Sequence, residues 1–124
     1  TYYWTPWDYA SGATASANDS LYGYDHGYSR AETDEVAWYS ANCGTAVSVN
    51  GSTNIVAQKR PNALGLYDMS GNVWEWTTAL KGQNDHVIRG GSWMDNVGIM
   101  VGIIGAYDTD EQLAGIGFRL ARTE

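Results

Sequence analysis

The sequence predicts one α+β domain in which little of the chain forms regular secondary structure. The length of 124 residues is enough for one hydrophobic core and too short for two. Fifteen glycines against two prolines indicate many tight turns within an ordered fold. The apolar segments are short and lie between long polar segments, so we expect the loops to carry the function.

The first half of the chain is expected to be mostly irregular. Residues 13–35 are small and polar apart from a few tyrosines, which predicts a surface loop whose tyrosine rings hold it against the body. Residues 55–59 are a candidate short strand, and the Pro61-Asn62 pair that follows predicts a turn.

The second half contains a clearer strand at residues 73–77. Its apolar residues alternate with a period of two, so Trp74 and Trp76 share one face and Glu75 points to the other. We expect the two indoles to fill the core, and Asn72 to turn the chain just before them by using its side-chain amide.

Two further strands are predicted near the end of the chain. Residues 87–89 run into a glycine pair, where the missing side chains allow a bend or a close backbone contact. Residues 116–121 would form the last strand, with Phe118 and Leu120 on one face.

Composition and charge limit the kinds of partner. The net charge of −7 argues against nucleic acid, because phosphate binding requires clustered lysines and arginines. It favours basic or neutral partners instead. No apolar run approaches the roughly 20 residues that span a bilayer, so no membrane insertion is expected. The single cysteine, Cys43, excludes a disulfide within the domain.

Three motifs then appear in order. Residues 61–76 read PNALGLYDMSGNVWEW, residues 89–93 read RGGSW and residues 117–120 read GFRL. Together they resemble the formylglycine-generating-enzyme branch, also called the sulfatase-modifying-factor branch, of the C-type lectin fold. The resemblance implies a single C-type-lectin-like domain over residues 1–124, with the end of a helix at residues 7–10. Members normally have a strand and a helix before that point, so the chain is expected to be a minimal version of the fold or a fragment.

The resemblance does not extend to the copper site of the enzymes. They hold copper with two cysteines, which lie two and seven positions after the aromatic residue of the RGGS-aromatic motif. Counting from Trp93 gives Asp95 and Met100, and neither offers the thiolate that a cuprous ion prefers. A related branch uses a three-histidine iron site, whereas this chain has two histidines. We therefore predict that the domain is not an enzyme.

A structural calcium ion is the one cofactor that the resemblance implies. Backbone carbonyls and one carboxylate would hold it, at Ser70, Gly71, Val73 and Glu75. Oxygen ligands of this kind suit calcium. The alternative is that Glu75 is a buried carboxylate paired with Arg89 or Arg119. No other cofactor is expected.

The segment at residues 94–115 resembles the variable region of another branch, the variable proteins of diversity-generating retroelements. In those proteins RGGSW and IGFR bound a segment that is copied with errors at adenines. Randomising the first two bases of an asparagine codon yields Asp, Val, Gly, Ile, Ala, Tyr, Thr and Leu, all of which occur here. It does not yield Met, Glu or Gln. Met100 is therefore predicted to be a fixed core residue, and Met94, Glu111 and Gln112 need other template codons.

This resemblance implies a receptor- or adhesin-type protein that displays diversified side chains on a rigid scaffold. We expect its partner to be a protein on a host or target cell, met outside the cell or on a virion or cell surface. The tyrosine, tryptophan and isoleucines would anchor the ligand, and the aspartates would give selectivity. The predicted ligand-binding residues are Trp93, Met94, Asp95, Asn96, Gly98, Ile99, Ile104, Ala106, Tyr107, Asp108, Asp110, Glu111 and Gln112.

Several alternatives stay open at this stage. Residues 99–104 could be an ordinary buried strand, which would show apolar side chains buried on both of its faces. The domain could be an active or degenerate relative of the enzymes, with a cleft for a peptide or small molecule, or a structural part of a larger surface protein. A calcium-dependent sugar lectin would need an EPN or QPD triplet and a WND motif. Residues 93–96 read WMDN and match the WND motif only weakly.

Overall fold

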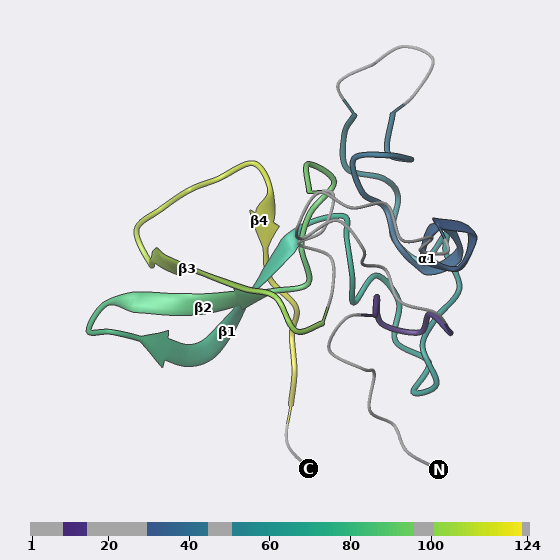
Figure 1. The fold of residues 1–124 in the computed structure, drawn as a ribbon. Helices are drawn as coiled ribbons and strands as arrows, with labels where there is room; N and C mark the ends of the chain where they lie inside the picture. The colour runs from purple at the N-terminus through teal and green to yellow at the C-terminus, as the bar shows by residue number, and fades with distance from the viewer. Residues whose placement is uncertain (1–8, 15–29, 45–50, 96–100, 123–124) are drawn as a thin grey trace.

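The computed structural model describes residues 9–14, 30–44, 51–95 and 101–122. This part of the chain is mostly strand and loop with little helix (Figure 1), as the sequence predicts. The regular elements are one helix, α1 (Arg30–Val36), and four strands, β1 (Trp74–Lys81), β2 (Asp85–Arg89), β3 (Ile104–Asp108) and β4 (Ile116–Gly117). Within the described residues, no helix is both long and apolar enough to cross a membrane.

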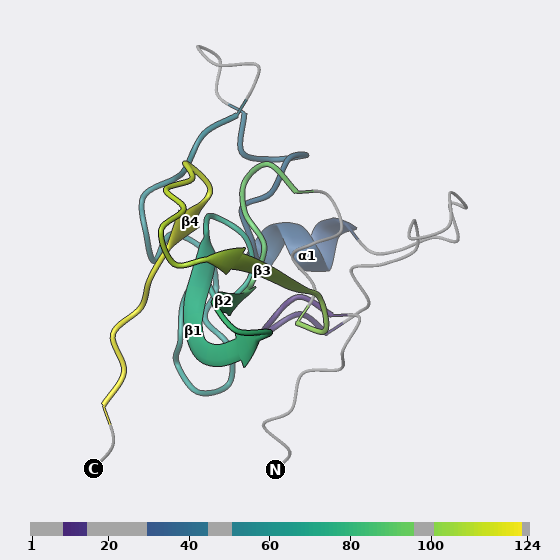
Figure 2. The ribbon, with the colours of Figure 1, turned by 90° about the vertical axis from the view of Figure 1, so that its left-hand side faces the viewer.

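The four strands form one sheet in the order β3-β2-β1-β4. β1 and β2 make an antiparallel hairpin, β3 pairs antiparallel with β2, and β4 runs parallel to β1. The register shifts between Trp76 and Leu80, and the sheet curls strongly about the hairpin (Figure 2). The predicted variable segment at 94–115 therefore lies between two strands of one sheet, β2 before it and β4 after it, and it contains β3.

The main buried cluster lies at the end of α1. Ala10, Val36, Ala37 and Tyr39 form a buried cluster, and Ile103 packs against it from the segment before β3. α1 has only seven residues, too few for a stable helix in isolation, so its packing against this cluster stabilises it. The prediction of a loop over residues 13–35 is therefore wrong for the residues within α1, and the tyrosines at 22, 24 and 28 lie outside the described residues.

The Gly71-Asn72 pair forms a junction that joins distant segments. Asn72 has a left-handed backbone, with φ of 67°, and so turns the chain as predicted. Its N–H donates to the Trp38 carbonyl at 2.7 Å, and its own carbonyl accepts from the Trp93 N–H at 2.9 Å. The Gly71 N–H donates to the Gly90 carbonyl at 2.7 Å. We call these five residues the central junction, because they tie the α1 side of the molecule to the RGGSW motif.

The predicted strand at residues 73–77 is confirmed and extends to Lys81. The prediction that its indoles fill the core is wrong, because Trp74 and Trp76 are each only partly buried. The fully buried residues of the hairpin are instead on β2, where Val87 and Ile88 are both buried.

The strand predicted at residues 55–59 is not present. Ile55 is 77% exposed, and no described strand runs beside this segment to pair with it. Ala57 has a left-handed backbone, and its N–H donates to Asp68 Oδ2 at 2.7 Å, so a turn replaces the strand. The turn predicted at Pro61-Asn62 is confirmed by the Asn62 side chain, whose Oδ1 accepts from the backbone N–H groups of Leu64 and Leu66.

The last predicted strand is shorter than expected. β4 ends at Gly117, and Phe118 beyond it is 76% exposed, so residues 118 and 120 do not form an inward face. The chain leaves the sheet here because the Arg119 side chain turns to Glu75 and to the carbonyls of Tyr67 and Asp68. At the other end of the chain, residues 11 and 12 form a turn in which the Ala13 N–H donates to the Ala10 carbonyl, and residues 7–8 of the predicted helix end lie outside the described residues.

Candidate ligand-binding site

The start of the 94–115 segment is held by one carboxylate. Asp95 Oδ2 accepts hydrogen bonds from Trp74 Nε1 at 2.7 Å, from the Ser92 N–H at 2.8 Å and from Ser92 Oγ at 2.7 Å. Ser92 is completely buried, and its Oγ also accepts from the Met94 N–H. We call Asp95 and its two partners the Asp95 clasp. It gives Asp95 a structural role, and the ligand contact that the sequence predicts for Asp95 stays a prediction.

β3 divides the predicted ligand-binding residues between two faces of the sheet. Tyr107 lies opposite His86, and Gly105 lies opposite Ile88, whose other neighbour is Trp76. Side chains alternate along a strand, so Tyr107 is on the face of the two β1 tryptophans. The other predicted β3 residues point to the opposite face, and these are Ile104, Ala106 and Asp108.

Gly105 makes room for the packing beneath Tyr107. A Cβ atom at this position would lie 2.8 Å from Ile88 Cγ1 and 3.8 Å from the Tyr107 ring. The missing side chain lets Ile88 reach full burial, and the tyrosine ring sits beside it, 42% exposed. The missing side chain at Gly105 therefore allows Tyr107, two residues further along β3, to stand exposed on the same face.

Two adjoining hollows lie on the tryptophan face. The smaller one, about 140 Å³, includes Trp74, Met94, Asp95, Tyr107, Leu113 and Ile116 among its lining residues. The larger one, about 420 Å³, shares Leu113 and Ile116 with it and adds Trp76, Glu111, Gln112 and Phe118. We call the two hollows together the β3–β4 groove, since the loop that links these strands forms one wall.

The groove brings together five of the predicted ligand-binding residues, namely Met94, Asp95, Tyr107, Glu111 and Gln112. Met94 is 53% exposed and Leu113 is 41% exposed, so large apolar side chains stand open to solvent on both sides of it. Isolated exposed apolar residues are ordinary, whereas a contiguous group of them at a hollow is typical of an interaction site.

The other predicted residues lie elsewhere. Ile104, Ala106 and Asp108 face away from the groove, and Asp110 lies in the turn beyond β3. Trp93 is partly buried, and its ring lies beside Gly51, which lies against the Cys43 thiol. Asn96, Gly98, Ile99 and the predicted core residue Met100 lie outside the described residues.

Sequence reasoning missed several large side chains of the groove lining, namely Trp74, Trp76, Leu113, Ile116 and Phe118. The tryptophans were assigned to the core, although the polar handle of an indole suits a half-buried position equally well. Leu113 lies within the predicted variable segment and is a residue that an altered asparagine codon can encode, which is a signal that could have found it.

The alternative of an ordinary buried strand at residues 99–104 is contradicted in its described part. Residues 101–103 form a turn and a loop, and β3 begins only at Ile104. Ile103 packs on the core, but Ile104 is 43% exposed. The Val101 N–H donates to the Tyr9 carbonyl, and its carbonyl accepts from Arg89 Nη1. Hydrogen bonds thus hold the backbone at Val101, and the side chains that follow are not buried on both faces.

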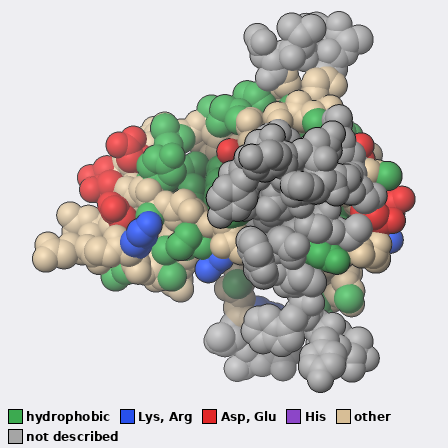
Figure 3. Space-filling view, viewed as in Figure 1, with side chains coloured by type: hydrophobic (Ala, Val, Ile, Leu, Met, Phe, Trp, Pro, Cys, Tyr) green, Lys and Arg blue, Asp and Glu red, His purple; other side chains and the backbone are tan. Residues whose placement is uncertain are grey.

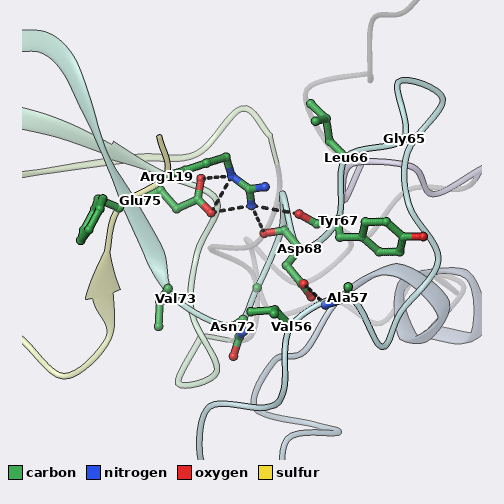
Figure 4. A pocket seen from close by; sticks show the side chains of 12 residues that line it. Val56, Ala57, Gly65, Leu66, Tyr67, Asp68, Asn72, Val73, Glu75 and Arg119 are labelled. Carbon is green, nitrogen blue, oxygen red and sulfur yellow. Dashed lines mark hydrogen bonds and ion pairs between the residues drawn. The ribbon is translucent and has the colours of Figure 1, made fainter. Parts of the chain in front are cut away.

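A third hollow, about 440 Å³, lies on the opposite face beside Glu75 and Arg119 (Figure 4). Arg119 Nε donates to both carboxylate oxygens of Glu75, at 3.1 and 3.0 Å, and Nη2 donates to Oε1 at 2.7 Å. Nη2 also donates to the carbonyls of Tyr67 and Asp68. Hydrogen bonding to Glu75 raises the pKa of Arg119 further above its usual range. Of the two predicted arginine partners of Glu75, the structure selects Arg119.

The Glu75–Arg119 ion pair engages one of the predicted calcium ligands. Glu75 would have to supply a carboxylate oxygen, and both of its oxygens already accept from a guanidinium. A divalent cation at this oxygen would also face the positive charge of Arg119. Ser70 Oγ accepts from the Ser11 N–H, which holds this loop in place without a metal. The arrangement favours the ion-pair alternative, and calcium at Ser70, Gly71, Val73 and Glu75 stays a prediction.

Replacing Arg119 with lysine tests the importance of the planar guanidinium. A lysine ammonium does not match the fork of one carboxylate and two carbonyls, so we expect a loss of about 1 kcal/mol of unfolding free energy. Arg122→Lys, at an exposed position nearby in the sequence, is the matched control. Urea denaturation, with and without added calcium, measures the unfolding free energy of both variants. Equal stability of the two variants would contradict the role given to Arg119.

The comparisons with known proteins agree with the motifs. The sulfatase-modifying factor enzyme 1-like domain family matches residues 5–124. The chain belongs to this family. The sequence prediction of a formylglycine-generating-enzyme-like protein is thereby confirmed, and the described fold, mostly strand with a curled sheet and little helix, fits the C-type-lectin-like type of its neighbours.

Two curated relatives cover different parts of the domain. The chaperone protein LppX of Paenibacillus barcinonensis is 31% identical over 137 residues, which span 95% of this chain and 47% of LppX. The inactive C-alpha-formylglycine-generating enzyme 2 of Mus musculus is 54% identical over 37 residues, which span 27% of this chain and 12% of that protein.

Two solved structures resemble the fold. Treponema denticola variable protein 1 has 28% sequence identity and a TM-score of 0.60, and the match covers 90% of this chain and 43% of that one. The crystal structure of CarF has 39% identity and a TM-score of 0.54 over 68% of this chain and 31% of the other. The chain thus spans less than half the length of each of these relatives. The predicted resemblance to a variable protein is confirmed by the Treponema neighbour.

Proposed function

We propose that this domain binds a protein ligand through the β3–β4 groove, as the variable protein of a diversity-generating retroelement, and that it catalyses no reaction. The observation that carries the proposal is the grouping of Met94, Tyr107, Glu111 and Gln112 around one groove, within the segment that the flanking motifs bound. The partner is a protein on a host or target cell. The domain works outside the cell or on a virion or cell surface, on a C-type-lectin-like frame.

Several groove side chains take no part in the hydrogen bonds that hold the backbone, which supports a binding role. The central junction and the Asp95 clasp hold the backbone through hydrogen bonds, and they do not depend on the side chains of Tyr107 or Leu113. Substitutions at those two positions therefore change the groove without removing the contacts that fix it. A surface that is ordered in advance loses less conformational entropy when it binds.

The chemistry of the segment also supports a non-catalytic role. Asp95 stands where the enzymes keep the first copper-binding cysteine, and its carboxylate is engaged by Trp74 and Ser92. Cys43 is buried, and its thiol donates to the Trp93 carbonyl at 3.1 Å. Among the relatives are a protein named as an inactive enzyme and another named as a chaperone, which fits proteins that bind without turnover.

The variant Tyr107→Ala separates binding from stability. The ring is 42% exposed beside the groove, so its removal should weaken ligand binding about tenfold or more while lowering the melting temperature by only a few degrees. The matched control is Thr78→Ala, an exposed position on β1 outside the groove lining. Binding of the fluorescent domain to a panel of candidate target cells, followed by flow cytometry, measures the first effect, and calorimetry measures the second. Equal cell binding by Tyr107→Ala and the control would reject the groove as the binding site.

A further inference from the structure

We infer that the partner segment that occupies the β3–β4 groove is basic and apolar, with a lysine or arginine next to large apolar side chains. This inference rests on the proposed function and names the chemistry of its ligand. It follows from the distribution of charge around the groove, together with the apolar walls described above.

Carboxylates gather at one end of the sheet, where Asp85 and Asp108 lie on the face away from the groove and Glu111 lines the groove itself. Asp108 and Asp85 lie directly opposite each other in the β2–β3 ladder, an arrangement of like charges that destabilises a sheet. Asp110 and Glu111 follow in the next turn. None of the ion pairs between described residues involves any of these four, and Lys81 is the cross-strand neighbour of Asp85 without forming one. Asp108 Oδ1 accepts from the Asp110 N–H within the turn, whereas Glu111 lines the groove, so we assign Glu111 and its neighbour Asp110 to recognition.

The groove itself has a negative and apolar lining. Among the residues that the structure describes, the charged lining residues are Asp95 and Glu111, and none of the lining residues is a lysine or arginine. Figure 3 shows acidic side chains along the outer edge of the molecule on the side of the loop from β3 to β4, next to hydrophobic surface. Clustered charge of one sign along a cleft attracts ligands of the opposite sign.

A lysine or arginine side chain matches this lining in both of its parts. The long aliphatic stem packs on apolar surface, here Leu113 and Met94, while the charged head stays near carboxylates at the rim. The exposed ring of Tyr107 and the partly buried ring of Trp76 add faces on which a cation can lie. An acidic partner would face the carboxylates of Asp110 and Glu111, and nucleic acid would be repelled for the same reason.

The test uses the intact domain labelled with ¹⁵N and three synthetic peptides as probes. The first peptide is Lys-Leu-Lys-Tyr-Lys, the second replaces each lysine with glutamate, and the third is Lys-Gly-Lys-Gly-Lys. We expect the first to shift the amide resonances of Tyr107, Glu111 and Leu113, and the other two to leave them unchanged. The double variant Asp110→Asn with Glu111→Gln should raise the dissociation constant of the first peptide about three- to tenfold.

The matched control is Glu35→Gln, which removes a charge from α1, away from the groove (Figure 1). It should leave the dissociation constant unchanged, and salt should weaken binding to the unmodified domain. The inference is overturned if the glutamate peptide binds the groove as tightly, if the glycine peptide gives the same shifts, if none of the three shifts the groove resonances, or if the charge variants have no effect. Any of these results leaves the proposed function standing, because the Tyr107→Ala experiment on cells judges that separately.

Discussion

The variant Gly71→Ala is expected to lose about 4 kcal/mol or more of unfolding free energy, a large part of the stability of a small domain. Two causes add. The φ of Gly71 is 76°, a left-handed conformation that costs an alanine about 1 kcal/mol. The new Cβ would also lie 2.2 Å from the Trp38 carbonyl oxygen and 2.9 Å from the carbonyl carbon, so the central junction would have to move apart.

Gly82→Ala is the matched control for this variant. Gly82 also has a left-handed backbone, with φ of 89°, but a Cβ there would meet nothing within 4 Å. It should lose only the conformational part, about 1 kcal/mol. Urea denaturation of both variants separates the close approach at Trp38 from the cost of the backbone conformation. Two losses of similar size would show that the junction is not as tightly packed as described.

The variant Asp95→Ala is expected to lower the unfolding free energy by about 3 kcal/mol. It removes the charged acceptor of three hydrogen bonds, and hydrogen bonds to charged groups contribute about 1.5–3 kcal/mol each before the rest of the structure relaxes. The Ser92 donors would then be left buried without their acceptor. Asp110→Ala, at an exposed position of the same segment, should change stability by less than about 0.5 kcal/mol.

A double-mutant cycle tests the same clasp from its other side. Trp74→Phe keeps an aromatic ring and removes only the indole N–H that donates to Asp95. If this hydrogen bond contributes as described, the double variant should be less destabilised than the sum of the single ones, by about 1–2 kcal/mol. Additive losses would show that Asp95 acts only through Ser92.

The local parts of the fold could be predicted from the sequence. The alternation at residues 73–77 identified β1, and the glycine pair after residue 89 correctly predicted where β2 ends. The turn at Asn72 was also predicted, although its side-chain amide bonds the backbone of Asn54 and not the turn itself. These features depend on neighbouring residues, which a single sequence contains.

The rest depends on contacts between distant residues. Residues 55–59 have strand-forming side chains, but strand propensity requires a partner strand, and there the Asp68 carboxylate bonds the backbone instead. α1 has no clear apolar period and exists because a core lies beside it. The structural role of Asp95 was not predicted, because nothing in the neighbouring sequence reveals that the Trp74 indole lies 2.7 Å from its carboxylate. The groove was only partly predicted for the same reason, because β1 supplies one wall and the β3–β4 loop supplies the other.

Sequencing the DNA around this gene in several independent isolates tests the central claim most directly. The account predicts a near-copy of the stretch that encodes residues 94–115, close to a reverse-transcriptase gene and differing from it mainly at adenines. The varying positions should include groove residues such as Tyr107 and Leu113 and should spare Gly71, Trp74 and Ser92. Isolates with an invariant 94–115 stretch and no near-copy would contradict a diversified binding protein and leave the domain with an ordinary, fixed surface.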